Sequence, residues 1–148
     1  MRELQIINKK NPWPKGWGKK TSIMGVINLT PDSFSDGGDL DSTKKVLDQV
    51  KHFLSNGVDV IDLGAQSTRP GAEEVGSNIE IKRLIPYLKI IKSEFPEVLI
   101  SIDTFNSDVA YEALLNGANW INDVTGGRRD IKNFGCCIKI QLSICNNS

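Results

Sequence analysis

Hydrogen-bonding side chains follow four short apolar runs of the sequence, and each run is typical of a strand covered on both faces. In chain order the runs reach Asn28, Asp62, Asp103 and Asn122. A single polar residue at a strand end is commonly a helix cap or a turn former. Four in succession favour a binding site instead, because the carboxyl ends of parallel strands meet at one edge of a sheet.

Two long loops that follow the first and second runs are rich in hydrogen-bond donors. Residues 28–38 read NLTPDSFSDGG, and residues 64–74 read GAQSTRPGAEE. Arg69 offers a planar fork that matches phosphate or carboxylate oxygens. Hydroxyl groups in these loops include those of Thr30, Ser33, Ser67 and Thr68. The two loops therefore predict a site for an anion.

Asp103 and Asn122 suit a different task, since each is a short side chain set directly on a strand end. A carboxylate and an amide at such positions can pair with the donors and acceptors along the edge of a planar heterocycle. The strands beneath them would hold that geometry rigidly.

The elements that must position these residues alternate along the chain, which predicts an α/β fold with a parallel sheet. Strands are expected over residues 22–27, 58–63, 98–102 and 118–124, and helices over 42–55, 78–95 and 107–116. Pro86 lies inside the second helical pattern, where it either kinks the helix or marks a restart. Twice a helix is followed by Asn-Gly and then a strand with a polar end. An open doubly wound sheet and a (β/α)₈ barrel both fit this order.

The composition argues for a single soluble domain of 148 residues, with 18 basic and 18 acidic side chains. A balanced charge lacks the cationic field of nonspecific nucleic-acid binding. Neither a secretory leader nor a membrane-spanning run is evident, so a cytoplasmic protein is expected. We divide the chain into an N-terminal extension (1–21), a domain (22–134) and an atypical tail (135–148). The cysteine-rich tail reads as a foreign or truncated ending, with an edge strand as the alternative.

Three motifs, MGVINLTPDSFSDGG, GAQSTRPGAE and SIDTFNSDVAYEALLNGANWINDVTGG, resemble dihydropteroate synthase of the folate pathway. The resemblance covers about residues 22 to 130. It implies a (β/α)₈ barrel, of which this chain holds about the first four βα units. It also implies a transferase that condenses 6-hydroxymethyl-7,8-dihydropterin diphosphate with p-aminobenzoate, giving 7,8-dihydropteroate and diphosphate with the help of Mg²⁺.

The same resemblance assigns a role to each matching position. Asn28 would hold Mg²⁺ and the diphosphate, and Asp103 and Asn122 would hold the pterin. The second loop would contact the diphosphate and the aminobenzoate through Ser67, Thr68 and Arg69, while Phe34 and Pro70 would wall the aminobenzoate ring. Asn28, Thr68, Arg69 and Asp103 would form the catalytic set.

The chain departs from the family pattern because no counterpart exists for a later aspartate, a lysine and an Arg-x-His element. We therefore expect this chain alone to be inactive and poorly stable. A homodimer is left open by the resemblance, although a truncated chain gives it no support. The alternatives are a noncatalytic pterin-binding or interaction fragment and a methyl-tetrahydrofolate-binding relative. A methyl-tetrahydrofolate-binding relative would not need Asn28 or the Ser67-Thr68-Arg69 loop, so these residues count against it.

Overall fold

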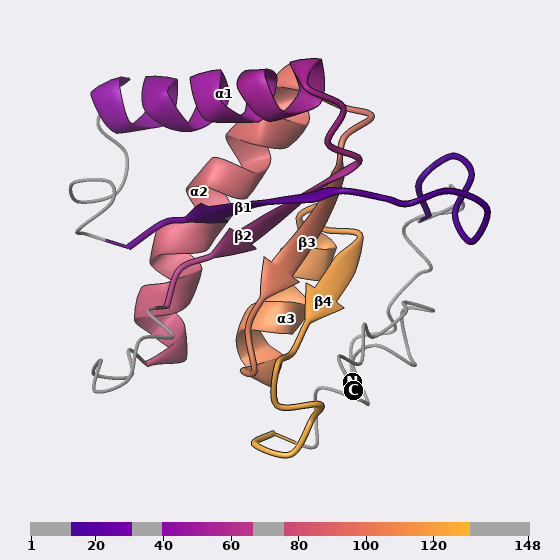
Figure 1. Ribbon diagram of the computed structural model, residues 1–148. Coiled ribbons are helices and arrows are strands. Elements are labelled where there is room, and N and C mark those ends of the chain that lie inside the picture. The colour runs from indigo at the N-terminus through magenta and orange to yellow at the C-terminus, as the bar shows by residue number, and fades with distance from the viewer. Residues whose placement is uncertain (1–12, 31–39, 67–75, 131–148) are drawn as a thin grey trace.

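A computed structural model describes residues 13–30, 40–66 and 76–130 of the chain. The described residues form four strands and three helices. They alternate along the sequence (Figure 1). The strands are β1 (Met24–Asn28), β2 (Val60–Gly64), β3 (Leu99–Asp103) and β4 (Trp120–Asn122); the helices are α1 (Leu40–Ser55), α2 (Ser77–Glu94) and α3 (Ser107–Leu115). The four strands and three helices predicted for residues 22–124 are thereby confirmed, with ends that differ by a few residues. The tail at 135–148, with its alternative edge strand, lies outside the described residues, as do residues 1–12 of the N-terminal extension. None of the described helices is long and apolar enough to cross a membrane.

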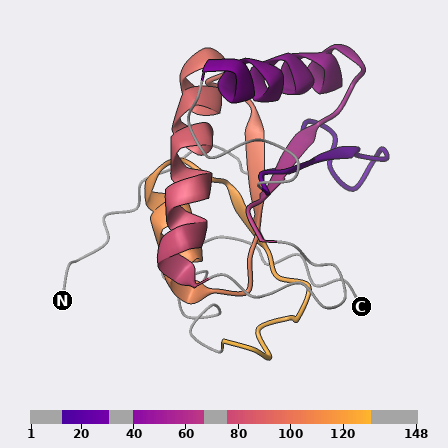
Figure 2. The ribbon, with the colours of Figure 1, turned by 90° about the vertical axis from the view of Figure 1, so that its left-hand side faces the viewer.

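The strands form one parallel sheet in the order β1-β2-β3-β4, which is also their order in the sequence. All three helices pack on the same side of this sheet (Figure 2). A doubly wound sheet would reverse its strand order and carry helices on both faces. Of the two architectures that the sequence left open, the described residues therefore have the arrangement of a (β/α)₈ barrel, over four of its eight strands.

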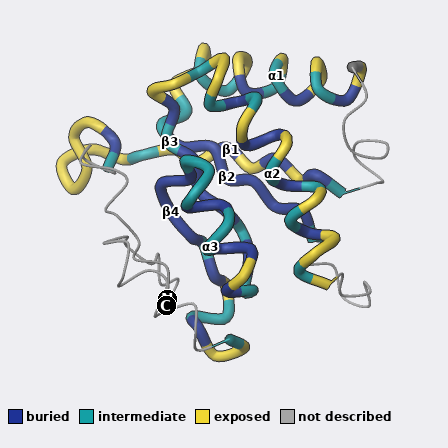
Figure 3. The backbone as a smooth tube through the Cα atoms, turned by 180° about the vertical axis from the view of Figure 1, so that it is seen from behind, coloured by how far each residue is buried: buried dark blue, intermediate teal, exposed yellow. Residues whose placement is uncertain are grey.

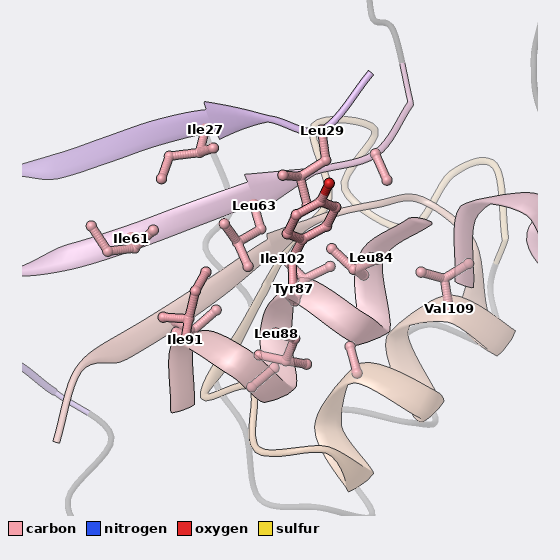
Figure 4. Packing of buried hydrophobic residues seen from close by; sticks show 14 of the residues in the cluster. Ile27, Leu29, Ile61, Leu63, Leu84, Tyr87, Leu88, Ile91, Ile102 and Val109 are labelled. Carbon is pink, nitrogen blue, oxygen red and sulfur yellow. The ribbon is translucent and has the colours of Figure 1, made fainter. Parts of the chain in front are cut away.

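The hydrophobic core lies between the helices and one face of the sheet. Figure 4 shows side chains from the first three strands, among them Ile27, Leu63 and Ile102, meeting side chains of α2 such as Leu88 and Ile91. All five of these side chains are at most 1% exposed. Alternate residues of a strand point to opposite faces, so one apolar residue in two is enough to build this layer.

Helix α1 lies so close to β1 that only glycine fits at position 25. A Cβ atom built on Gly25 would lie 2.6 Å from Cδ2 of Phe53 and 3.0 Å from its Cγ. Helix α2 continues through Pro86 without interruption, so the restart that the sequence allowed at this residue is wrong. Its apolar side is buried against the sheet, which supplies the stability that an internal proline removes.

The two Asn-Gly sequences form the same turn at the ends of α1 and α3. Gly57 and Gly117 have φ of 83° and 101°, in the left-handed region. At the first turn the amide of Val58 donates to the carbonyl of Phe53, and at the second turn Ala118 donates in the same way, to Ala113. This six-residue hydrogen bond is that of a Schellman motif, and it directs the chain into the next strand.

Part of the predicted N-terminal extension packs against the domain. The rings of Trp13 and Trp17 stack with their centroids 4.7 Å apart, and Trp120 of β4 lies 5.1 Å from the first and 5.6 Å from the second. The carboxylate of Asp59 also accepts hydrogen bonds from Lys20 Nζ and Ile23 N. In Figure 3 the strands are mostly buried, whereas this segment is mostly exposed.

Candidate functional site

The carboxyl end of the sheet brings three of the predicted site residues into one row. Asn28 is aligned with Gly64, Gly64 with Asp103, and Asp103 with Asn122. The row therefore crosses all four strands. A parallel register places aligned residues on the same face of a sheet. We call the face that carries this row, opposite the helices, the polar face.

Alternation along the strands explains why these side chains avoid the core. The residue before each of them on its strand, such as Ile27, Ile102 and Ile121, is buried on the helix side. The next residue must then point to the polar face. Burial of the apolar residues thus fixes the direction of Asn28, Asp103 and Asn122.

Gly64 leaves space in the middle of the row. A Cβ atom at this position would lie 3.5 Å from Oδ2 of Asp103 and 3.7 Å from Oδ1 of Asn28. The amide of the first strand and the carboxylate of the third thus flank a residue without a side chain. A ligand can approach the backbone of β2 closely between them.

Burial changes the acid strength of Asp103. Desolvation, followed by the charges of Asp62 and Asp123, raises the pKa of Asp103 to about 6. The group is ionised at neutral pH and would attract positive charge that develops on a bound ring. A carboxyl group with a pKa this close to neutrality is common at functional sites.

Asp62 lies one layer beneath the row; the sequence marked it as the polar end of the second apolar run but assigned it no role at the site. Its side chain is 2% exposed, and its Oδ2 accepts a hydrogen bond of 3.2 Å from Nδ2 of Asn122. Burial raises its pKa, while Ser101 and Asn122 oppose that rise. The signal in the sequence was a carboxylate in the middle of the apolar strand VIDLG.

Glu80 is a second buried carboxylate that the sequence reasoning missed. It lies in the first turn of α2 and is 1% exposed. Burial raises its pKa, the hydroxyl of Thr104 lowers it, and the charge of Asp103 raises it further. Helical spacing from Leu84, Leu88 and Ile91 already placed position 80 on the buried side of the helix, which was the available signal.

Asp123 has a structural role beside the row. Its Oδ1 accepts hydrogen bonds from the amide and the hydroxyl of Thr125 at 2.8 and 2.7 Å, and its Oδ2 accepts one from the amide of Gly127 at 2.9 Å. These bonds shape the turn that follows β4. The carboxylate is 3% exposed and still contributes negative charge next to Asp103.

The remaining predicted site residues lie outside the described residues. They are Phe34, Ser67, Thr68, Arg69 and Pro70. Their assignments therefore stay predictions. The structure brings together the residues expected to hold the pterin with the residue expected to hold Mg²⁺, namely Asp103 and Asn122 with Asn28.

Similar proteins share both the sequence and the fold. The chain is 47% identical to the dihydropteroate synthase of Clostridium beijerinckii over 128 residues, which cover 86% of this chain and 47% of that protein. It is 54% identical over 116 residues to a folate synthesis bifunctional protein of Arabidopsis thaliana, covering 77% of this chain and 24% of the relative. The chain thus spans about half the length of the synthase and about a quarter of the bifunctional protein.

Solved structures agree with these relatives. The crystal structure of dihydropteroate synthase from Clostridium difficile, in the presence of pteroic acid, matches with a TM-score of 0.81 and 44% identity, over 88% of this chain and 50% of that chain. The enzyme from Xanthomonas albilineans with 4-aminobenzoic acid matches with a TM-score of 0.76 and 30% identity, over 90% and 51%. The described sheet is therefore half of a TIM barrel.

A protein-family model places the chain more directly. The model described as pterin binding enzyme matches residues 24–147, which is most of the chain and includes the whole row of the polar face. The chain belongs to the pterin binding enzyme family.

Proposed function

We propose that this chain carries part of the site of dihydropteroate synthase, a transferase of folate biosynthesis. The substrates would be 6-hydroxymethyl-7,8-dihydropterin diphosphate and p-aminobenzoate. The observation that supports this function best is the single row formed by Asn28, Gly64, Asp103 and Asn122. It sets a carboxylate and an amide beside an open backbone position, as recognition of a planar polar ring requires.

The chemistry proposed for these residues is electrostatic. The C–O bond between the pterin methylene group and the diphosphate breaks, and the resulting cation is delocalised into the pterin ring. The nitrogen of p-aminobenzoate then attacks that carbon and loses a proton. Ionised Asp103 would favour positive charge on the ring, because opposite charges interact strongly where burial lowers the local dielectric constant.

Asn28 would hold Mg²⁺ in this proposal. Among the described residues no group of three or more His, Cys, Asp or Glu side chains could hold a metal ion. Mg²⁺ sites commonly combine one or two carboxylates with substrate phosphates and water, and in this proposal the amide oxygen of Asn28 would take the place of a carboxylate. When bound, the ion would neutralise negative charge on the leaving diphosphate.

Turnover should need more than this chain, because it covers about half of the similar synthases. We expect isothermal titration to detect binding of the pterin diphosphate with Mg²⁺ by the purified chain, without condensation. Condensation by the chain alone would contradict this expectation. A cytoplasmic location stays a prediction, and a homodimer is left open by the resemblance without support from this chain.

The second candidate is a noncatalytic pterin-binding fragment, for which the same row of residues would suffice. Co-expression with the C-terminal half of the Clostridium beijerinckii synthase separates the two functions. Condensation by the mixed protein, lost in Asp103→Asn, would support the transferase. Pterin binding without condensation by a well-folded mixed protein would support the fragment.

A further inference from the structure

The hydrogen bond between Asp62 and Asn122 fixes the orientation of an amide at the site. An ionised carboxylate can only accept hydrogen bonds, so the nitrogen of Asn122 must face Asp62. The donor and acceptor atoms lie 3.2 Å apart. Of the remaining polar atoms of this amide, the oxygen and the second N–H group are left for other partners.

Asp62 is placed to do this by the register of the sheet. It is aligned with Val26 on one side and Ser101 on the other, one layer below the row that contains Asn122. Both Asp62 and Ser101 are at most 2% exposed. The hydroxyl of Ser101 is near enough to lower the pKa of Asp62, but among the described residues Oδ1 of Asp62 and Oγ of Ser101 make no hydrogen bond of ordinary geometry.

A buried carboxylate with one unused oxygen needs a reason, because leaving such an atom unpaired usually destabilises a protein. Its hydrophobic neighbours on β2, Ile61 and Leu63, give no support to a charge at this position. The hydrogen bond from the amide of Asn122, a site residue, does provide such a reason. The charge of Asp62 also contributes to the raised pKa of Asp103, which is partly buried on the neighbouring strand β3.

We propose that Asp62 is a positioning residue that determines which ring edge the site accepts. By holding the nitrogen of Asn122, it presents the amide with its oxygen and one N–H group side by side. That pair complements an edge with an amino group next to an unprotonated ring nitrogen, as in a 2-aminopyrimidinone. The inference rests on the proposed function, because it names the edge of the ligand that the pterin site reads.

An edge with the opposite order of donor and acceptor tests this proposal. Lumazine carries an oxygen where pterin carries its 2-amino group, and an N–H group where pterin has the ring nitrogen. We expect the chain, in titration calorimetry near neutral pH, to bind pterin at least about tenfold more tightly than lumazine, since a mismatched buried pair is costly.

Asp62→Asn should remove that preference while keeping the shape of the side chain. An amide at position 62 can donate or accept, so Asn122 is free to turn over and the two ligands should bind within about threefold of each other. Asp59→Asn is the matched control, because it makes the same change just before β2 and far from the row. A native-like Asp62→Asn chain that keeps the full preference would overturn the proposal.

An NMR measurement on the free chain tests the contact without any ligand. The side-chain N–H signals of Asn122, assigned by their loss in Asn122→Ser, should shift with pH as Asp62 titrates. The shift should occur above the ordinary range of aspartate. Because Asp103 is aligned with Asn122 and also titrates near pH 6, the measurement uses the Asp103→Asn variant, in which the shift should vanish on adding Asp62→Asn but not on adding Asp59→Asn. If the Asn122 signals depend on pH in the same way with aspartate or asparagine at position 62, the proposal is overturned. If the signals do respond to Asp62 but the chain fails to bind pterin, that result counts against the proposed function alone.

Discussion

Asn28 and Asp103 face the same point above Gly64, from strands on either side of it. A Cβ atom on Gly64 would stand 3.7 Å from the amide oxygen of Asn28 and 3.5 Å from the carboxylate of Asp103. Both distances are ordinary contacts, so a methyl group fits the protein itself. It would occupy the space that the two polar groups share.

Gly64→Ala should therefore separate binding from stability. Gly64 has no positive φ, so the new side chain should leave the free energy of unfolding equal or raise it by about 0.4–1 kcal/mol. Pterin binding, measured by titration calorimetry, should weaken at least about tenfold because the approach to β2 is narrowed.

Gly57→Ala is the matched control for this change. Gly57 has a φ of 83° in the turn after α1, so alanine there should lower the free energy of unfolding by about 1–3 kcal/mol. Because the turn lies at the opposite end of β2, pterin affinity should be retained in the folded fraction. Unchanged binding in Gly64→Ala would show that the ligand does not use the space above β2.

The raised pKa of Asp103 predicts that stability falls as pH rises from 4 to 6. Its folded-state pKa is about 6, above the ordinary 3.8, so the folded chain binds more protons than the unfolded chain in this window. Stability therefore decreases with rising pH there. Urea unfolding at several pH values should show that the free energy of unfolding decreases less with rising pH in Asp103→Asn than in the parent. Some decrease should remain, because the raised pKa values of Asp62 and Glu80 act in the same direction.

Asp59→Asn is the control for this series. The backbone amide of Ile23 and the side chain of Lys20 lower the pKa of Asp59, so its contribution to stability is lost below pH 4, as pH falls. Asp59→Asn should therefore leave the dependence of the free energy of unfolding on pH unchanged between pH 4 and 6. An Asp103→Asn chain with the parent slope would mean that Asp103 does not titrate in this window.

The order of strands and helices could be predicted because each segment carries its own local signal. Asn56 and Asn116 illustrate this: each side chain donates to the carbonyl four residues earlier, in both cases at 2.7 Å. Such turns depend on neighbouring residues only, and so a sequence pattern reveals them. The row of Asn28, Asp103 and Asn122 could also be predicted, because strand ends of a parallel sheet converge.

Contacts between distant segments could not be predicted in the same way. Asp62 and Asn122 are 60 residues apart, and their hydrogen bond depends on a register that no local pattern encodes. Helical spacing indicates that Glu80 lies on the apolar side of its helix, but Thr104 and Asp103, which also affect its pKa, belong to another segment. Burial raises the pKa of Asp62 and of Glu80, and that burial exists only once the helices have packed on the sheet.

Gly25→Ala should destabilise the chain at the contact between β1 and α1. The added Cβ atom would lie 2.6 Å from Cδ2 of Phe53, so the aromatic ring or the helix must move. Overpacking of this kind costs about 1–3 kcal/mol, which urea unfolding followed by circular dichroism can measure. Adding Phe53→Leu should restore part of the loss. Equal stability of Gly25→Ala and the parent would show that α1 packs farther from β1.

All three tryptophans of the chain lie in one cluster, which makes their fluorescence a probe of the N-terminal segment. Trp120 is 1% exposed, whereas Trp17 is 47% exposed. Aromatic pairs contribute about 0.5–1.5 kcal/mol beyond their buried area, so losing both contacts of Trp120 should loosen the segment.

The double variant Trp13→Ala, Trp17→Ala leaves Trp120 as the sole emitter. Its emission should lie at longer wavelength than that of the buried indole in the parent, and an external quencher such as iodide should reach it. Trp17→Ala is the control, since Trp13 then still packs on Trp120 at 5.1 Å and should keep it shielded. If Trp120 in the double variant stays as protected from iodide as in Trp17→Ala, then other parts of the chain bury it, and the N-terminal segment does not cover the sheet.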